Sequence, residues 1–233
     1  LRYLEYWKVR LVREALIERE ILLKAMPHIS WPMRFVLPYH KNMRFDVNTP
    51  TSKLLNIFMP WLKGRRPAWL IRFGLFLYDN LGGRKFLKGT TSLHLSNVKE
   101  GVPLHNKYLK AFEYSDCWIE DSRLVVLNAR DAEIRGAKIN VRTKVVSAEQ
   151  INGIWHLTLH SIIDDAKRVV KAKMIVNAGG PWVEDIIQNK VRLNSSEGVR
   201  LVRGSHLITK KLYEHNKCYF FQGEDGRIIF TIP

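Results

Sequence analysis

The stretch Lys173-Met-Ile-Val-Asn-Ala-Gly-Gly-Pro-Trp182 decides the fold class, because it reads as a short strand, a turn of small residues and the start of a helix. Met174 to Val176 form a β-prone run, and the small residues that follow let another body approach the backbone closely. Pro181 suits the first position of a helix, where its missing N–H costs nothing, and the free N–H groups there favour an anion or a dipole. The stretch predicts an α/β protein with a turn that faces a ligand, although strand, Gly-Gly turn and helix recur in many α/β proteins.

The first half of the chain shows both helical and strand-like patterns. Residues 4–25 suit an amphipathic helix that ends before Pro27, with apolar positions at Leu4, Leu11, Ala15, Ile21 and Leu22. Residues 31–39 alternate like a strand, and 53–62 and 69–81 read as helices, the second closed by Gly82-Gly83. A strand from Phe112 leads to Asp121, a good N-cap for a helix to about Ile134.

The second half is richer in strand signals. Segments 138–146, 155–162 and 168–176 predict a small antiparallel meander that ends in the Ala-Gly-Gly turn. Segments 199–209, 217–221 and 227–232 predict strands of a second sheet. The chain is therefore expected to pass between two domains more than once.

Five segments together carry a family resemblance: 1–6 LRYLEY, 32–35 PMRF, 66–79 RPAWLIRFGLFLYD, 112–124 FEYSDCWIEDSRL and 198–206 GVRLVRGSH. In this order they resemble the FAD-dependent glycerol-3-phosphate dehydrogenases, the respiratory enzymes that reduce quinone. The resemblance runs almost from end to end. It implies a mixed α/β (α+β) fold, part of a two-domain FAD-dependent oxidoreductase of the D-amino-acid-oxidase or glycine-oxidase type.

Two features depart from that family pattern. Residues from about Arg44 to Gly64 look like an insertion, and no two glycines have the G-x-G spacing of the G-x-G-x-x-G turn that holds the FAD pyrophosphate. We interpret the chain as the middle of a longer enzyme. The expected division is 1–30 as part of the FAD-binding domain, 31–111 as a substrate or cap-domain portion with inserted helices, 112–190 as FAD-binding domain and 191–233 as substrate-domain strands.

The resemblance implies four residues for substrate chemistry. Arg2 would grip the substrate phosphate through paired hydrogen bonds, with Tyr3 beside it and Arg200 as a further substrate contact. His206 would be the base for alcohol oxidation, since the pKa of an imidazole lies close to neutrality. On an alternating strand Arg200 and His206 would share one face and Arg203, which stands where the family often has Lys, the other. From the residues alone, a solvent-exposed Arg2 and a His206 at a strand end are the simpler interpretations.

The resemblance also implies FAD contacts. Val145 lies on a strand whose backbone would pair with the adenine edge, and Ala178, Gly179, Gly180 and Trp182 form the turn near the flavin. An ordinary strand at Val145 is the alternative. Because the glycine-rich pyrophosphate site is missing, we expect the isolated 233 residues to hold FAD weakly or not at all and to be inactive alone.

Composition limits the class of partner. The chain has 233 residues, 46% of them hydrophobic, and a formal charge of +16 from 38 Lys and Arg against 22 Asp and Glu. This charge indicates anionic partners: a phosphorylated substrate, an anionic membrane surface or nucleic acid. The scattered basic residues and the lack of nucleic-acid motifs argue against nucleic acid. The family resemblance implies that the phosphorylated substrate is glycerol 3-phosphate. The two cysteines form no disulfide framework. The expected location is the cytoplasm or, as a peripheral protein, the cytoplasmic face of the inner membrane.

Metal chemistry is not predicted. His156 and His160 are four positions apart, about 13 Å along a strand, which is too far for shared ligation. Asp121 fits a helix cap, and Asp116 is expected to accept a hydrogen bond from backbone or from Arg123.

Two rival functions remain open. The first is an amine or amino-acid oxidase relative, which shares the Asn-Ala-Gly-Gly-Pro-Trp type of turn but does not account for the segments at 2–3, 114–117 and 200–206. The second is a non-enzymatic basic module that binds a membrane or another protein through residues 54–81, whose helices are alternatively simply buried.

Overall fold

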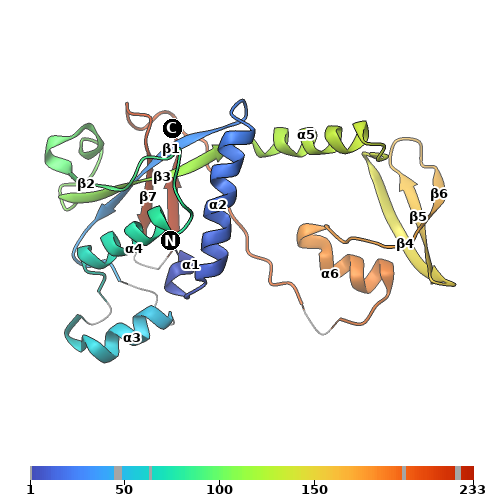
Figure 1. The fold of residues 1–233 in the computed structure, drawn as a ribbon, viewed down its shortest axis with the longest axis horizontal. Helices are drawn as coiled ribbons and strands as arrows, with labels where there is room; N and C mark the ends of the chain where they lie inside the picture. Colours follow the sequence, from blue (N-terminus) through green and yellow to red (C-terminus); the bar gives the residue numbers. More distant parts are fainter. Residues whose placement is uncertain (1, 45–48, 63–64, 196–197, 224–226) are drawn as a thin grey trace. The chain divides into compact units, whose positions relative to one another are not determined.

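The computed structural model describes residues 2–44, 49–62, 65–195, 198–223 and 227–233, apart from the side chain of Arg2. They divide into two compact units, the first formed by residues 1–127 and 209–233 and the second by residues 128–208. Each unit is described by itself. Both contain helices and strands, which confirms the predicted mixed α/β class (Figure 1).

The first unit is built on a five-stranded sheet in the order β2-β3-β1-β7-β8. β1 (Ser30–Tyr39) pairs antiparallel along its whole length with β3 (Lys110–Ile119), and β3 pairs with the short β2 (Thr91–His94). On its other edge β1 pairs parallel with β7 (Cys218–Gln222), which pairs antiparallel with β8 (Ile228–Thr231). The central strand therefore joins segments from both ends of the chain (Figure 1).

Both faces of this sheet are covered. One face holds a cluster of Phe35, Leu37, Leu75, Phe112, Tyr114 and Cys218, in which Leu75 comes from helix α4 (Ala68–Asn80). The other face holds Val36, Leu95, Ala111 and Tyr219, covered by the 3-10 turns η2 (Leu95–Asn97) and η3 (Lys99–Gly101) and the loop that follows them. A strand that is buried on both faces needs a continuous apolar run, and Phe35-Val36-Leu37 supplies it.

The predicted first helix is interrupted. α1 (Arg2–Glu5) is followed by Trp7, whose φ of 56° is left-handed, and α2 (Val9–Ala25) begins after it. The buried face of α2 consists of Val12, Leu16, Glu20 and Leu23, whereas the predicted Leu11 and Ile21 are about half exposed. Glu20 is buried because its carboxylate accepts hydrogen bonds from the backbone N–H groups of Lys85 and Phe86. The apolar pattern alone therefore selected the wrong face.

Three further helices lie close to their predicted bounds. α3 (Pro50–Phe58) begins at the N-cap Thr49 and is followed by the 3-10 turn η1 (Pro60–Leu62), where the sequence predicts one helix over 53–62. α4 matches the helix expected at 69–81. α5 (Asp121–Ile134) starts at Asp121 as expected, with the carboxylate accepting a hydrogen bond from the Ser122 N–H, and it runs from the first unit into the second.

The second unit contains the predicted meander. β4 (Thr143–Ile151), β5 (Ile154–Ser161) and β6 (Lys167–Ala172) form an antiparallel sheet, and Asn152-Gly153 turns between the first two with positive φ at both residues. A 3-10 turn, η4 (Gly180–Trp182), then leads into α6 (Val183–Asp185) and a π-helical turn, η5 (Ile186–Val191).

Three strand predictions in the second half of the chain need correction. The strand expected at 138–146 begins only at Thr143, and the one expected at 168–176 ends at Ala172. Residues 199–209 form no strand, because neither described sheet offers them a partner. β7 and β8 confirm the strands expected at 217–221 and 227–232. The assignment of ranges to FAD-binding and substrate domains stays a prediction.

Candidate functional site

The helix α1 carries two of the predicted substrate residues. Arg2 is its first residue, and Tyr3 is 60% exposed. The carbonyl of Tyr3 accepts hydrogen bonds from the N–H groups of Tyr6 and Lys8, which closes the turn after the helix. A cavity of about 340 Å³ lies against this segment, lined by residues 4–7 and by side chains of β1, α4, β7 and β8. α1 therefore stands over a largely apolar hollow.

Polar contacts from distant parts of the chain hold α1 in place. The Glu5 carboxylate pairs with the Arg66 guanidinium at 2.6 Å, and both side chains are about 15% exposed. The Glu5 carbonyl accepts a hydrogen bond of 2.9 Å from the Thr51 hydroxyl. Sequence reasoning missed these three residues, because no periodic signal links positions so far apart.

The turn at 177–182 is organised by Asn177. Its side-chain oxygen accepts from the Gly179 N–H at 3.1 Å, and its side-chain nitrogen donates to the Val183 carbonyl at 3.0 Å. Gly180 has a φ of 53° and faces open space, so another group can approach its backbone. A Cβ at Gly179 would lie 2.3 Å from Ile186, so there the missing side chain makes room for the chain itself. Ala178 and Trp182 are exposed beside this opening.

Val145 lies on an open edge. β4 is an outer strand of the three-stranded sheet, and a bulge between Val145 and Ser147 interrupts its pairing with β5. Val145 is 37% exposed. The outer side of β4 has no strand partner in this sheet, although the turn η5 lies close to β4. Recognition of an adenine edge by the Val145 backbone stays a prediction.

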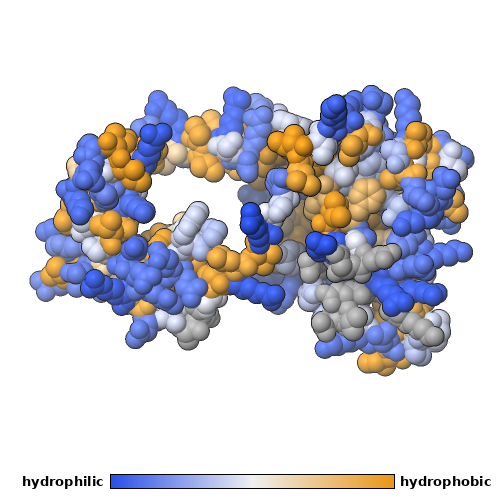
Figure 2. Space-filling view, turned by 180° about the vertical axis from the view of Figure 1, so that it is seen from behind, coloured by the Kyte–Doolittle hydropathy of each residue, from blue (hydrophilic) through white to orange (hydrophobic). Residues whose placement is uncertain are grey.

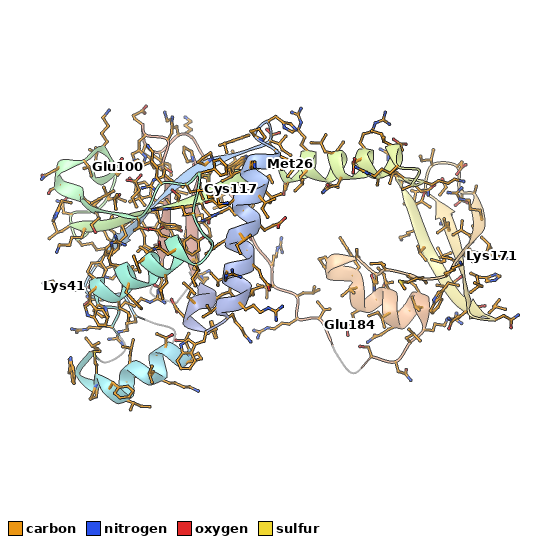
Figure 3. All side chains as sticks on the ribbon, viewed as in Figure 1. Met26, Lys41, Glu100, Cys117, Lys171 and Glu184 are labelled. Atoms are coloured by element: carbon orange, nitrogen blue, oxygen red, sulfur yellow. The ribbon has the colours of Figure 1, made fainter. Side chains whose placement is uncertain are left out.

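Arg200 and His206 lie in an extended segment without regular structure. Since residues 198–208 form no strand, the prediction that Arg200 and His206 share a strand face is wrong. The segment is anchored at its start, where the carboxylate of Glu184, labelled in Figure 3, accepts a hydrogen bond from the Val199 N–H at 3.0 Å. Arg200, Arg203 and His206 are exposed.

The predicted site residues belong to different units. Arg2 and Tyr3 lie in the first, whereas Val145, the 178–182 turn, Arg200 and His206 lie in the second. Within the second unit, Glu184 links the helix after the 178–182 turn to the segment that leads to His206.

A cluster of charged side chains, which we call the Lys217 cluster, lies beside β3 and β7. Lys217 pairs with Glu100, which Figure 3 labels, and with Glu113, and Arg34 donates to Glu113 at 2.7 Å. Burial by itself would raise the pKa of Glu113, but the hydrogen bonds from Arg34 and Lys217 outweigh it and hold that pKa below its ordinary value. The pKa of Glu100 is lowered in the same way, since burial opposes but the Lys217 hydrogen bond prevails. Burial works against the Lys217 ammonium, yet its two carboxylates raise the pKa of Lys217.

The hydrogen bonds around Asp116 suit a structural role. Its carboxylate accepts hydrogen bonds from the Tyr78 hydroxyl at 3.1 Å, from the Arg19 guanidinium at 3.3 Å and from the Cys117 N–H at 3.0 Å. The expectation of a hydrogen bond from backbone or from Arg123 is confirmed by the Cys117 N–H, while Arg123 pairs with Glu120. Burial and the nearby Asp116 raise the pKa of Tyr78.

The described part of the chain offers neither a metal site nor a membrane-spanning helix. Across residues 2–44, 49–62, 65–195, 198–223 and 227–233, no group of three or more His, Cys, Asp or Glu side chains is arranged to hold a metal ion. No helix within these same ranges is long and apolar enough to cross a membrane.

Comparisons with known proteins point to one family. The family model described as "FAD dependent oxidoreductase" matches residues 1–233. The D-erythritol 1-phosphate dehydrogenase of Brucella abortus is 50% identical, and a glycerol-3-phosphate dehydrogenase of Pseudomonas tolaasii is 45% identical, each over 100% of this chain. The chain spans 42% and 40% of those two relatives.

A solved structure agrees on the fold. The glycerol-3-phosphate dehydrogenase from Bacillus halodurans, complexed with FAD, matches with a TM-score of 0.53 over 95% of this chain and 36% of that one. Since the two sequences are 19% identical, this likeness supports the fold alone.

Proposed function

The chain belongs to the FAD-dependent oxidoreductase family, and we propose that the complete protein oxidises sn-glycerol 3-phosphate to dihydroxyacetone phosphate and passes the electrons to a quinone. The observation that carries the proposal is that relatives with 50% and 45% identity across the whole chain are both named dehydrogenases of a phosphorylated polyol. The net charge of +16 suits an anionic substrate. When FAD is bound, it is the hydride acceptor.

Each predicted residue has a role in this proposal. The Arg2 guanidinium holds the substrate phosphate, with Tyr3 and Arg200 as further substrate contacts. An imidazole nitrogen of His206 takes the proton of the hydroxyl group that is oxidised. The Val145 backbone would receive the adenine edge, and Ala178, Gly179, Gly180 and Trp182 the flavin side. The open edge of β4 and the open space above Gly180 support these two assignments.

Steady-state kinetics of the complete FAD-loaded protein test the substrate roles. Reduction of a soluble quinone is followed at varied glycerol 3-phosphate. Arg2→Ala should chiefly raise KM, because it removes a contact to the ground-state phosphate, whereas His206→Ala should chiefly lower kcat, because it removes proton transfer. Unchanged kinetics in both variants would refute the assignment.

D-erythritol 1-phosphate is a second candidate substrate. It is favoured by the higher identity of the Brucella relative, 50% against 45%. Both substrates carry a phosphate on a polyol, so Arg2 would bind either one. The ratio of kcat/KM for the two substrates distinguishes the candidates, and turnover of D-amino acids or amines in place of both would instead support the rival oxidase function.

We also propose that the protein docks on an anionic membrane surface through α3, η1 and α4. These elements expose large apolar side chains: Ile57, Phe58, Trp61, Trp69, Phe73 and Phe76, each more than half exposed. Lys53 and Arg65 are exposed beside them, and Figure 2 shows hydrophobic surface at its lower right, where α3 lies. Aromatic and basic side chains together suit an interface of acyl chains and anionic headgroups. A peripheral location on the cytoplasmic face of the inner membrane is part of this proposal.

Liposome sedimentation tests the membrane surface. The complete protein should sediment with vesicles that contain anionic phospholipid and less with neutral vesicles, and Phe58→Ser with Trp61→Ser should reduce the bound fraction. Val125→Ser with Val126→Ser, on the exposed side of α5, is the matched control. Equal binding of both double variants would count against the surface, and absence of lipid binding by the parent protein would remove it. Stable capture of a protein partner by the same face in place of lipid would favour the non-enzymatic alternative for this surface.

A further inference from the structure

We infer that Glu5, Thr51 and Arg66 are positioning residues for substrate binding, because they fix the short helix α1 that presents Arg2. The inference rests on the proposed function, in which Arg2 holds the substrate phosphate. It concerns different residues, however, and can fail while that function stands.

The helix α1 is too short to be stable by itself. It has four residues, and a helix of this length is not stable in isolation because nucleation costs more than so few hydrogen bonds return. Trp7, in a left-handed conformation, separates it from α2, so the longer helix does not continue into it.

Side-chain packing beneath α1 is incomplete. The cavity of about 340 Å³ lies directly against residues 4–7. A helix over a hollow lacks the dense side-chain contacts that normally fix an element in a protein interior. Its position therefore depends on the directional contacts that remain.

Glu5 supplies directional contacts of this kind. It lies one helical turn after Arg2, its carboxylate pairs with Arg66 at 2.6 Å, and its carbonyl accepts a hydrogen bond from the Thr51 hydroxyl at 2.9 Å. A charge-assisted hydrogen bond between largely buried groups is stronger and more directional than a surface pair. Both ends of the same residue are thus fixed.

Arg66 and Thr51, the two partners of Glu5, are themselves anchored. The Arg66 N–H donates to the carbonyl of the buried Met43 at 2.7 Å, just after the central strand β1. Thr51 lies in the first turn of α3, whose N-cap Thr49 is fully buried and accepts a hydrogen bond from the Ser52 N–H. The contacts therefore transmit the position of the sheet and of α3 to α1.

Thr51 and Arg66 thus act together on α1 through their contacts with Glu5. We call these two residues the brace of α1, and we assign it the role of setting where Arg2 meets the phosphate.

The test uses the complete FAD-loaded protein and conservative pairs of variants. Arg66→Met and Thr51→Val should each raise KM for glycerol 3-phosphate, the first by about tenfold, as expected when a charge-assisted contact to the phosphate is weakened, while kcat changes by less than about twofold. Arg66→Lys and Thr51→Ser, which keep the charge or the hydroxyl, should recover most of the loss. The inhibition constant of inorganic phosphate, as competitor, should rise in parallel and reports binding without turnover.

Two controls separate the possible outcomes. Arg10→Met breaks the exposed pair of Arg10 with Glu14 on α2 and should leave KM unchanged. Arg2→Ala tests the proposed function itself: if it leaves KM unchanged, the phosphate assignment fails, whereas if it raises KM and the Arg66 and Thr51 variants do not, only the brace is refuted. Thr51→Val removes a single hydroxyl, so its KM tests the brace even if Arg66→Met does not fold.

Discussion

The stability of the first unit is expected to depend strongly on one residue, Lys217. Its ammonium lies between Glu100 and Glu113, and it extends from the residue just before β7. Lys217→Met should destabilise the first unit by about 2 kcal/mol, less than the roughly 3–5 kcal/mol typical of a fully buried pair, because the side chain is 31% exposed. Hydrogen exchange of the β1 and β3 amides measures this change. Lys211→Met, which breaks an exposed pair with Glu214, is the control, and equal effects of the two variants would contradict the prediction.

The same cluster predicts how stability depends on pH. The pKa values of Glu100 and Glu113 are lowered in the folded protein, so the unfolded chain binds more protons at mildly acidic pH. Stability is therefore fully present above the ordinary glutamate pKa of about 4.3 and is lost as pH falls through the lowered values. Lys217→Met should weaken this acid dependence in exchange experiments between about pH 3 and pH 6. An unchanged acid dependence would show that the cluster does not contribute.

Residue-level prediction succeeded where the signal is local. Asp121 was predicted to start a helix from its own side chain and the residues around it, and α5 begins there. Asp116 was expected to bond to a nearby donor, but its strongest side-chain partners, Arg19 and Tyr78, come from α2 and α4. Glu5 and Asn177 were missed for the same reason, since a role that depends on the folded neighbourhood leaves no pattern in the sequence.

At the scale of elements, the contact between α2 and the end of α4 is tight. A Cβ placed on Gly82 would lie 2.4 Å from the Cβ of Leu16 and 2.9 Å from its backbone carbon. Gly82→Ala should therefore push α2 and α4 apart and destabilise the first unit by about 1–3 kcal/mol. Gly74→Ala, within α4, meets nothing within 4 Å and should stabilise by up to about 1 kcal/mol. Hydrogen exchange along α2 measures both, and a neutral Gly82→Ala would show that the helices adjust freely.

The elements also show where sequence patterns stop being informative. β1, α4 and β7 follow from periodicity and apolar runs. The break at Trp7 was not foreseen, because neither Gly nor Pro marks it. The strand expected at 199–209 alternates as a strand should, but alternation describes the side chains only. A strand also needs a partner backbone, and the described sheets provide none for this segment.

At the scale of the whole molecule, we expect the 233 residues alone to retain little FAD. Val145 and the 178–182 turn offer neutral contacts, and the sequence holds no glycine-rich turn for the pyrophosphate. Scattered basic side chains lose entropy when they converge on an anion, so they replace such a turn poorly. The measurement is flavin absorbance in the protein peak after gel filtration with excess FAD, with the complete protein as the positive control. A stoichiometric yellow peak from the 233 residues would overturn the expectation.

The parallel pairing of β1 with β7 bears on the order in which the chain acquires its structure during synthesis. β1 is complete at residue 39, but its partners Cys218 and Tyr219 leave the ribosome only after the whole of 128–208. The second unit is continuous in sequence, so it is free to fold while β1 still has one open edge and Val36 still lacks Tyr219. An open edge on an apolar strand pairs readily with other chains. Translation between residues 39 and 219 is therefore the interval in which we expect the nascent protein to depend most on chaperones.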